Sequence, residues 1–106
     1  MTIQQVDVEI IRPLRSLVLR PGQPIESTDY DRDKEFQTLH YANIVNQKVC
    51  SIATFYPEPM LEVEALVAYR LRGMATHPNY RRQGLARAMM LQAMADIQKL
   101  GCDLIW

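Results

Sequence analysis

The sequence has 106 residues, enough for one small globular domain with a single core. Hydrophobic residues make up 48% and charged residues 23%, which is typical of a folded protein and excludes a disordered chain. Twelve basic and twelve acidic residues cancel, so the net charge does not favour nucleic acid or an anionic membrane as a partner.

No segment has the features of a signal peptide or a membrane span. The first ten residues lack a basic start followed by an apolar run, and no stretch reaches the roughly 18 apolar residues of a spanning helix. Cys50 and Cys102 lie in apolar runs without the spacing of a disulfide or metal site, so we expect buried free thiols and no metal. These features favour a reduced, cytoplasmic location.

The first third of the chain predicts a strand, a helix and a loop. Loose alternation over residues 2–8 predicts a short strand. Helical spacing of apolar residues from Ile10 to Val18 predicts a helix, in which Pro13 is tolerable only in the first turn. Residues 20–24 end this helix. The acidic segment 25–36 is expected to form a surface loop with one helical turn.

Two apolar, β-branched runs follow, at residues 38–45 and 48–56. Asn46 and Gln47 separate them, and asparagine suits a tight turn, so the two runs predict a β-hairpin.

Residues 67–76 predict a further strand. One face of this strand is expected to carry Tyr69, Leu71, Gly73 and Ala75. A glycine in the middle of a strand indicates a bulge or a close approach of the backbone.

Residues 84–100 predict the clearest helix of the chain. Its expected buried face consists of Ala86, Met90, Ala93, Ile97 and Leu100, flanked by Leu85, Met89 and Met94. Gly101 suits the end of the helix, and residues 104–106 begin another strand. Strand, helix and strand in this order predict a right-handed crossover between parallel strands.

The junction before this helix has the features of an anion site. The first turn of a helix presents free backbone N–H groups and a partial positive charge. Gly84 and Ala86 allow a bulky diphosphate to approach, and Arg81, Arg82 and Arg87 add positive charge. The loop lacks the Lys-Ser/Thr of a P-loop and the spacing of GxGxxG, which disfavours other kinds of nucleotide site.

Residues 69–106 resemble the coenzyme A-binding core of the GNAT superfamily of acyl-CoA N-acyltransferases. The matching features are a strand ending Gly73-Met74-Ala75-Thr76, the turn beginning His77-Pro78, the signature RRQGLA at residues 81–86, and a long helix ending at a glycine. The resemblance implies an α/β fold with a mixed, mostly antiparallel sheet flanked by helices. The helix at residues 84–100 is expected on one face of the sheet and the helix near residues 10–19 on the other.

The resemblance implies acetyl-CoA as cosubstrate, held mainly by backbone groups. Met74, Ala75 and Thr76 would pair with the pantetheine arm, and the amides of residues 82–87 would hold the pyrophosphate. The implied cofactor-binding residues are Met74, Ala75, Thr76, Arg81, Arg82, Gln83, Gly84, Leu85, Ala86 and Arg87. A bulge in the strand would open a wedge for the thioester, and an N–H near Met74 would face the thioester oxygen.

The implied activity is N-acetyltransferase, which transfers an acetyl group from acetyl-CoA to a primary amine by direct attack in a ternary complex. The alternative is a coenzyme A-binding module without catalysis, truncated or degenerate. Many family members have a glutamate four residues before the first pantetheine-pairing position, where this sequence has Arg70. The general base therefore stays open among Glu62, Glu64 and His40, each of which could instead have a structural or solvated role.

The resemblance also implies a domain that is incomplete. Family members continue beyond the second parallel strand with a helix and two strands, and their usual acid, a tyrosine, lies there. We therefore expect residues 1–106 to be a single N-acetyltransferase domain truncated after that strand. A small-molecule amine acceptor is the expected partner, and the position of the polar loop at residues 21–36 suggests that it shapes the acceptor site. Nucleic acid and membrane are not expected, and a homodimer is left open.

Overall fold

The computed structural model describes residues 1–106 and contains one five-stranded sheet in the order β1-β2-β3-β4-β5. The strands are β1 (Thr2–Val6), β2 (Leu39–Val45), β3 (Lys48–Pro57), β4 (Ala68–Thr76) and β5 (Leu104–Ile105). Pairing is antiparallel from β1 to β4 and parallel between β4 and β5. The mixed, mostly antiparallel sheet and the parallel crossover are confirmed.

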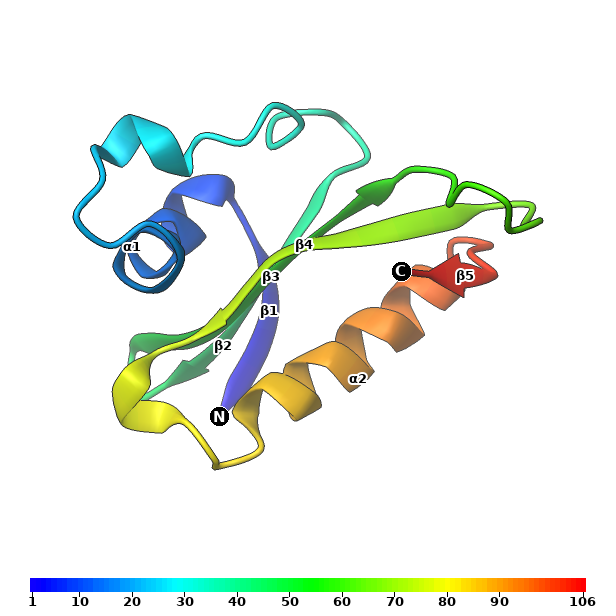
Figure 1. Ribbon diagram of the computed structural model, residues 1–106. Helices are drawn as coiled ribbons and strands as arrows, with labels where there is room; N and C mark the ends of the chain where they lie inside the picture. The colour runs from blue at the N-terminus through cyan, green and yellow to red at the C-terminus, as the bar shows by residue number, and fades with distance from the viewer.

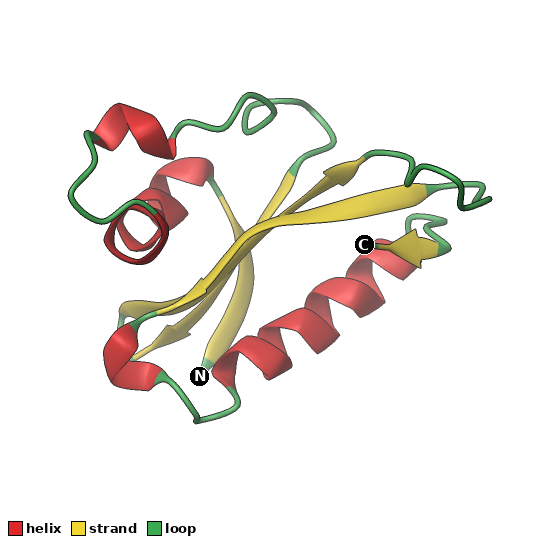
Figure 2. Ribbon diagram, viewed as in Figure 1, coloured by secondary structure: helices red, strands yellow, loops and turns green.

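Two helices cover opposite faces of the sheet (Figures 1 and 2). Helix α1 (Val8–Leu19) follows β1, and α2 (Leu85–Gln98) connects β4 to β5. Short 3₁₀ turns, η1 (Ile25–Thr28) and η2 (Pro78–Tyr80), lie in the connections, so the helical turn expected in segment 25–36 is present. Neither long helix combines the length and apolar character needed to cross a membrane.

The hairpin between β2 and β3 turns on two residues with left-handed backbone. Asn46 has φ 50° and Gln47 has φ 66°, which is the conformation of a type I′ turn. Val45 and Lys48 pair across it. The predicted hairpin is therefore confirmed, although glutamine is an uncommon residue for its second position.

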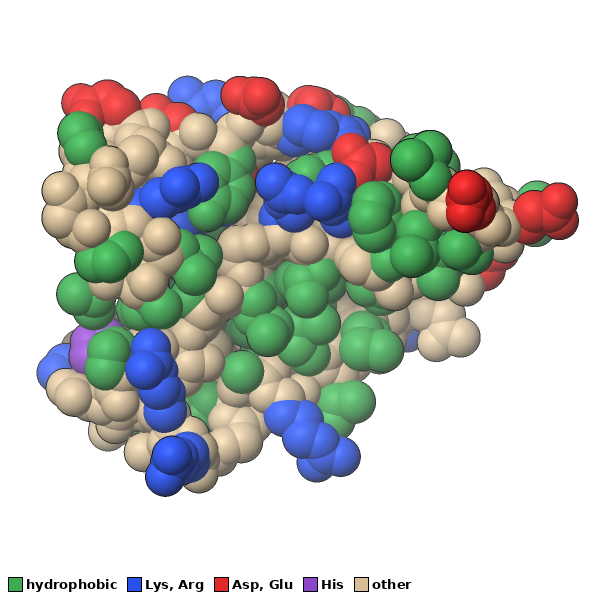
Figure 3. All heavy atoms as spheres, viewed as in Figure 1, with side chains coloured by type: hydrophobic (Ala, Val, Ile, Leu, Met, Phe, Trp, Pro, Cys, Tyr) green, Lys and Arg blue, Asp and Glu red, His purple; other side chains and the backbone are tan.

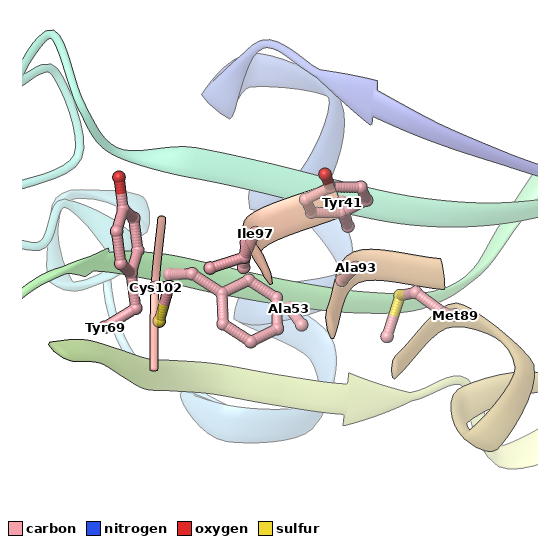
Figure 4. Packing of buried hydrophobic residues seen from close by; sticks show 8 residues of the cluster. Tyr41, Ala53, Tyr69, Met89, Ala93, Ile97 and Cys102 are labelled. Atoms are coloured by element: carbon pink, nitrogen blue, oxygen red, sulfur yellow. The ribbon is translucent and has the colours of Figure 1, made fainter. Parts of the chain in front are cut away.

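The core under α2 brings side chains of the helix against three strands (Figure 4). It consists of Tyr41, Ala53, Phe55, Tyr69, Met89, Ala93, Ile97 and Cys102. Tyr41 and Phe55 meet edge to face with ring centres 5.9 Å apart. The predicted helix face was partly wrong, because Met89 is fully buried whereas Leu100 is 59% exposed. Helix α2 ends at Gln98, so Leu100 lies beyond its last turn and no longer faces the sheet.

The core under α1 is smaller and consists of Val8, Ile11, Leu14, Ile52 and Ala75. Helix α1 begins at Val8, so Pro13 lies inside it and the expectation of a first-turn position was wrong. The N–H that proline lacks would have bonded to the carbonyl of Glu9. Both residues are exposed, so water can hydrate that carbonyl while the opposite side of the helix packs on the sheet.

A bulge at Gly73 changes which way β4 faces. Thr54 pairs with Arg72 and Ile52 with Ala75, so Ala53 alone faces two residues of β4. Gly73 has φ +61°, which favours glycine. The extra residue reverses the alternation: Tyr69 packs under α2 and Ala75 under α1. The bulge is confirmed, and the expectation that these side chains share a face was wrong.

A buried ion pair fastens the segment after α1 to the sheet. Arg15 is fully buried and donates to both carboxylate oxygens of Asp33, at 2.6 and 3.2 Å. It also donates to the carbonyl of Thr28 at 2.8 Å and the hydroxyl of Thr54 at 3.0 Å. Segment 25–36 is therefore more than a surface loop, because Thr28 and Asp33 are buried within it.

Replacement of Arg15 alone should destabilise the fold. Arg15→Met leaves the Asp33 carboxylate buried without its cation, and we expect a loss of about 3–5 kcal/mol in the free energy of unfolding, measured with urea. The double variant Arg15→Met/Asp33→Leu removes both charges and should lose less than the single variant. A double variant at least as unstable as Arg15→Met would contradict this account.

Candidate active site

The predicted anion site is a turn of alternating backbone conformation that leads into α2. Arg82 has φ 64° and Gly84 has φ 75°, and left-handed residues at such spacing turn successive N–H groups toward one concavity. Gly84 is the N-cap and has no side chain with which to cap the helix. The first helical bond runs from Ala88 N–H to Gly84 O at 3.0 Å, so the preceding N–H groups of Leu85 to Arg87 are left for a ligand.

These residues surround a hollow of about 120 Å³. It is lined by Thr76, Tyr80, Arg81, Arg82, Gln83, Gly84, Leu85, Ala86 and Arg87. A Cβ added to Gly84 would meet no atom within 4 Å, so the space in front of it is open. The three arginines are exposed and make no ion pair, so their charge is available to an anion. The structure thus gathers every predicted cofactor residue except Met74 and Ala75 around one space.

Met74 and Ala75 lie on a part of β4 that has a strand on one side only. The parallel pairing with β5 ends where Leu71 N–H donates to Trp106 O at 2.6 Å (Figure 1). On the other side, His77 N–H donates to the carbonyl of Cys50 at 2.8 Å. Backbone groups alternate between the two edges of a strand, so those of Met74 and Thr76 face the open side.

A second space lies at the bulge, on the face of β4 that carries α1. This groove of about 520 Å³ is lined by Leu19, Arg20, Asp29, Tyr30, Asp31, Arg72, Gly73 and Met74. A Cβ added to Gly73 would lie 3.1 Å from the Tyr30 ring, so glycine permits the close contact between strand and segment 25–36. Gly73 and Met74 therefore lie between the groove and the open edge of β4.

The structure places the three candidate bases away from this groove. His40 is buried, and its ring nitrogens lie 2.8 Å from Thr54 Oγ1 and 2.9 Å from the carbonyl of Asp33. Burial lowers the pKa of His40, outweighing the bond to that carbonyl, which raises it. Glu62 and Glu64 are exposed in the connection between β3 and β4. This connection leads into the first residue of β4, whereas Met74 lies near the last.

Arg70, which replaces the glutamate common in the resembled family, belongs to a cluster that sequence reasoning missed. Its Nη1 lies 2.6 Å from Glu58 Oε2, and its guanidinium stacks over the ring of Trp106 at 4.5 Å. Trp106 Nε1 donates to the carbonyl of Glu58 at 2.8 Å. Nothing in the spacing of these residues along the chain signals the contact, because it depends on the pairing of β3, β4 and β5.

Comparison with known proteins places these features in a family. The sequence matches the model of the acetyltransferase (GNAT) family over residues 9–106. It is 31% identical over 104 residues to the uncharacterized N-acetyltransferase YitI of Bacillus subtilis (strain 168), a match that covers 98% of this chain and 70% of that protein.

Solved structures share the fold at low sequence identity. Two are aminoglycoside 6′-N-acetyltransferases. AAC(6′)-Iy, in complex with a CoA-containing bisubstrate analogue, has a TM-score of 0.82 at 17% identity over 99% of this chain and 76% of that one. AAC(6′)-IG from Acinetobacter haemolyticus has a TM-score of 0.80 at 17% identity, over 99% and 77%. A ribosomal-protein-alanine N-acetyltransferase from Brucella melitensis biovar Abortus 2308 has a TM-score of 0.77 at 15% identity, over 99% and 78%.

The neutral state of His40 should appear in the pH dependence of stability. Because burial lowers its pKa in the fold, the unfolded chain takes up a proton first as the pH falls below about 6.5. The contribution of His40 is therefore complete above that pH and declines below it. Going from about pH 7.5 to 5.5, the wild type should lose more urea stability than His40→Gln, whose side chain does not titrate. Equal losses would contradict a buried, neutral His40.

Proposed function

We propose that this chain, which belongs to the acetyltransferase (GNAT) family, transfers an acetyl group from acetyl-CoA to a primary amine by direct attack within a ternary complex. The observation that carries the proposal is the continuity between the open edge of β4 and the arginine-lined hollow at the start of α2. A ligand with a diphosphate and an extended amide-containing arm fits both features together.

The pyrophosphate would lie in the hollow before α2. The N–H groups of residues 82–87 and the partial positive charge at the start of the helix favour an anion there. Hydrogen bonds from N–H groups to charged oxygens contribute about 1.5–3 kcal/mol each. Arg81, Arg82 and Arg87 add unpaired positive charge around the hollow. Arg81 Nε also donates to the carbonyl of Thr76 at 3.4 Å, which links the hollow to the end of β4.

The pantetheine arm would extend the sheet along the open edge of β4. Met74 and Thr76 direct their backbone groups to this side, and amides in the arm can pair with them as a neighbouring strand would. The arm would then run from the hollow toward Gly73 and bring the thioester to the bulge.

The reaction needs three things at the bulge: an approach for the amine, a donor for the developing oxyanion and a route for protons. The amine nitrogen attacks the thioester carbonyl, a C–N bond forms, the C–S bond breaks, and coenzyme A leaves as thiolate. A backbone N–H near Met74 would stabilise the oxyanion. The groove on the α1 face supplies the approach for the amine.

Freeing an amine of pKa about 10.4 at pH 7 costs on the order of 4–5 kcal/mol. His40, Glu62 and Glu64 do not line the groove, so we assign the base to none of them. Water in the groove would carry the proton to solvent.

The proposal is tested with radiolabelled acetyl-CoA and a panel of primary amines at pH 8. We expect acetyl transfer to at least one amine in the panel, with free thiol released in equal amount. Binding of acetyl-CoA without transfer to any amine would instead support a coenzyme A-binding module without catalysis.

Gly84→Glu should abolish acetyl-CoA binding, because the side chain would fill the hollow and place a negative charge where the pyrophosphate lies. We expect a loss of affinity of at least about 100-fold by calorimetry, since several charge-assisted bonds are lost together. Gly22→Glu is the matched control, because Gly22 also has positive φ, 74°, and open space around it. Equal affinities of the two folded variants would contradict the assignment of the hollow.

A further inference from the structure

The charges of the groove at the bulge do not cancel. Its charged side chains are Arg20, Arg72, Asp29 and Asp31. Asp29 forms an ion pair with Arg12 outside the groove lining, so its charge is compensated. Arg20 and Arg72 have no carboxylate partner. Two unpaired guanidinium groups therefore face a single unpaired carboxylate, that of Asp31.

The space-filling view agrees with this excess of positive charge. Figure 3 shows Lys and Arg side chains in the upper part of this face, just below the upper margin along which Asp and Glu side chains gather. Most of the acidic residues of segment 25–36 are in ion pairs. Asp33 is buried against Arg15, and Glu35 is paired with Arg32.

A further donor lies buried behind the groove, next to Gly73. Arg15 Nε is buried and has no hydrogen-bond partner, although both terminal nitrogens of the same guanidinium are bonded. It lies 3.5 Å from the position that a Cβ on Gly73 would take, and Gly73 lines the groove. A buried donor without a partner is costly, and a bound oxygen or water at the bulge would relieve that cost.

The ring of Tyr30 lies between the guanidinium groups of Arg15 and Arg20. The guanidinium of Arg15 stacks on its ring at 3.9 Å, and that of Arg20 lies over it at 5.8 Å. Cation–π contacts of this kind hold a ring in place. The groove therefore has a wall that is held in place, and its hydrogen-bond donors and positive charges lie on one side of it.

From this arrangement we propose that the acceptor amine also carries an anionic group, a carboxylate or a phosphate, which Arg20 and Arg72 bind. The inference rests on the proposed acetyl transfer and specifies its substrate class. Guanidinium groups bind carboxylate and phosphate through paired N–H donors. Asp31 is the carboxylate left to attract the ammonium end as it enters. A polycationic amine would instead meet two unpaired positive charges.

Matched acceptors test the preference. The pairs are phenylalanine and phenethylamine, and O-phosphoethanolamine and ethanolamine, with spermidine as the polycation; kcat/KM is measured at saturating acetyl-CoA. We expect the member with the anionic group to exceed its partner without that group by about tenfold in at least one pair, and the pair that responds identifies the group. Equal or faster transfer to the partners without an anionic group, or faster transfer to spermidine, would overturn the inference while leaving acetyl transfer established. No transfer to any amine would overturn both.

Arg20→Gln/Arg72→Gln tests the residues. In this variant the ratio of kcat/KM between the anionic acceptor and its partner should fall about tenfold. The control Lys99→Gln removes one exposed cation at the end of α2, outside the groove, and should leave the ratio unchanged. Thermal unfolding checks that the double variant is folded. An unchanged ratio in the folded double variant would overturn the role of these arginines.

Discussion

The bulge at Gly73 is the constraint on which the rest of the site depends. One extra residue in β4 reverses the alternation of its side chains, so the strand contributes Tyr69 to the core under α2 and Ala75 to the core under α1. Beyond Leu71 the strand has no partner on the side of β5, and its backbone groups are open there. A regular strand without the extra residue would have neither the groove nor the displaced backbone at the bulge.

Segment 25–36 lies against the bulge because Arg15 holds it there. The guanidinium joins α1 to Asp33, Thr28 and Thr54, and stacks on Tyr30, whose ring contacts the space above Gly73. Burying this ion pair has a large desolvation cost, which hydrogen bonds to nearly every polar atom offset. The Arg15–Asp33 ion pair therefore contributes more to the position of segment 25–36 beside the groove than to overall stability.

The site separates two kinds of positive charge. Around the hollow before α2, three arginines and the helix start suit a diphosphate that the backbone can hold. Around the groove, Arg20 and Arg72 stand on the other side of the bulge and belong to the acceptor. The two sets of arginines can therefore bind two different anionic groups, one on the cofactor and one on the proposed acceptor.

The sequence by itself determined the local features: the helix capped by Gly84, the hairpin at Asn46 and Gln47 and the bulge at Gly73. Each depends on residues close together in the chain, so spacing and turn chemistry were sufficient. The family came from the resemblance of residues 69–106 to a known motif. Only the tertiary structure decided what those features face. The reversed alternation of β4, the burial of Asp33 and His40, the exposure of Leu100 and the contact of Arg70 with Glu58 and Trp106 arise from strand pairing and packing between distant segments, which no local pattern encodes.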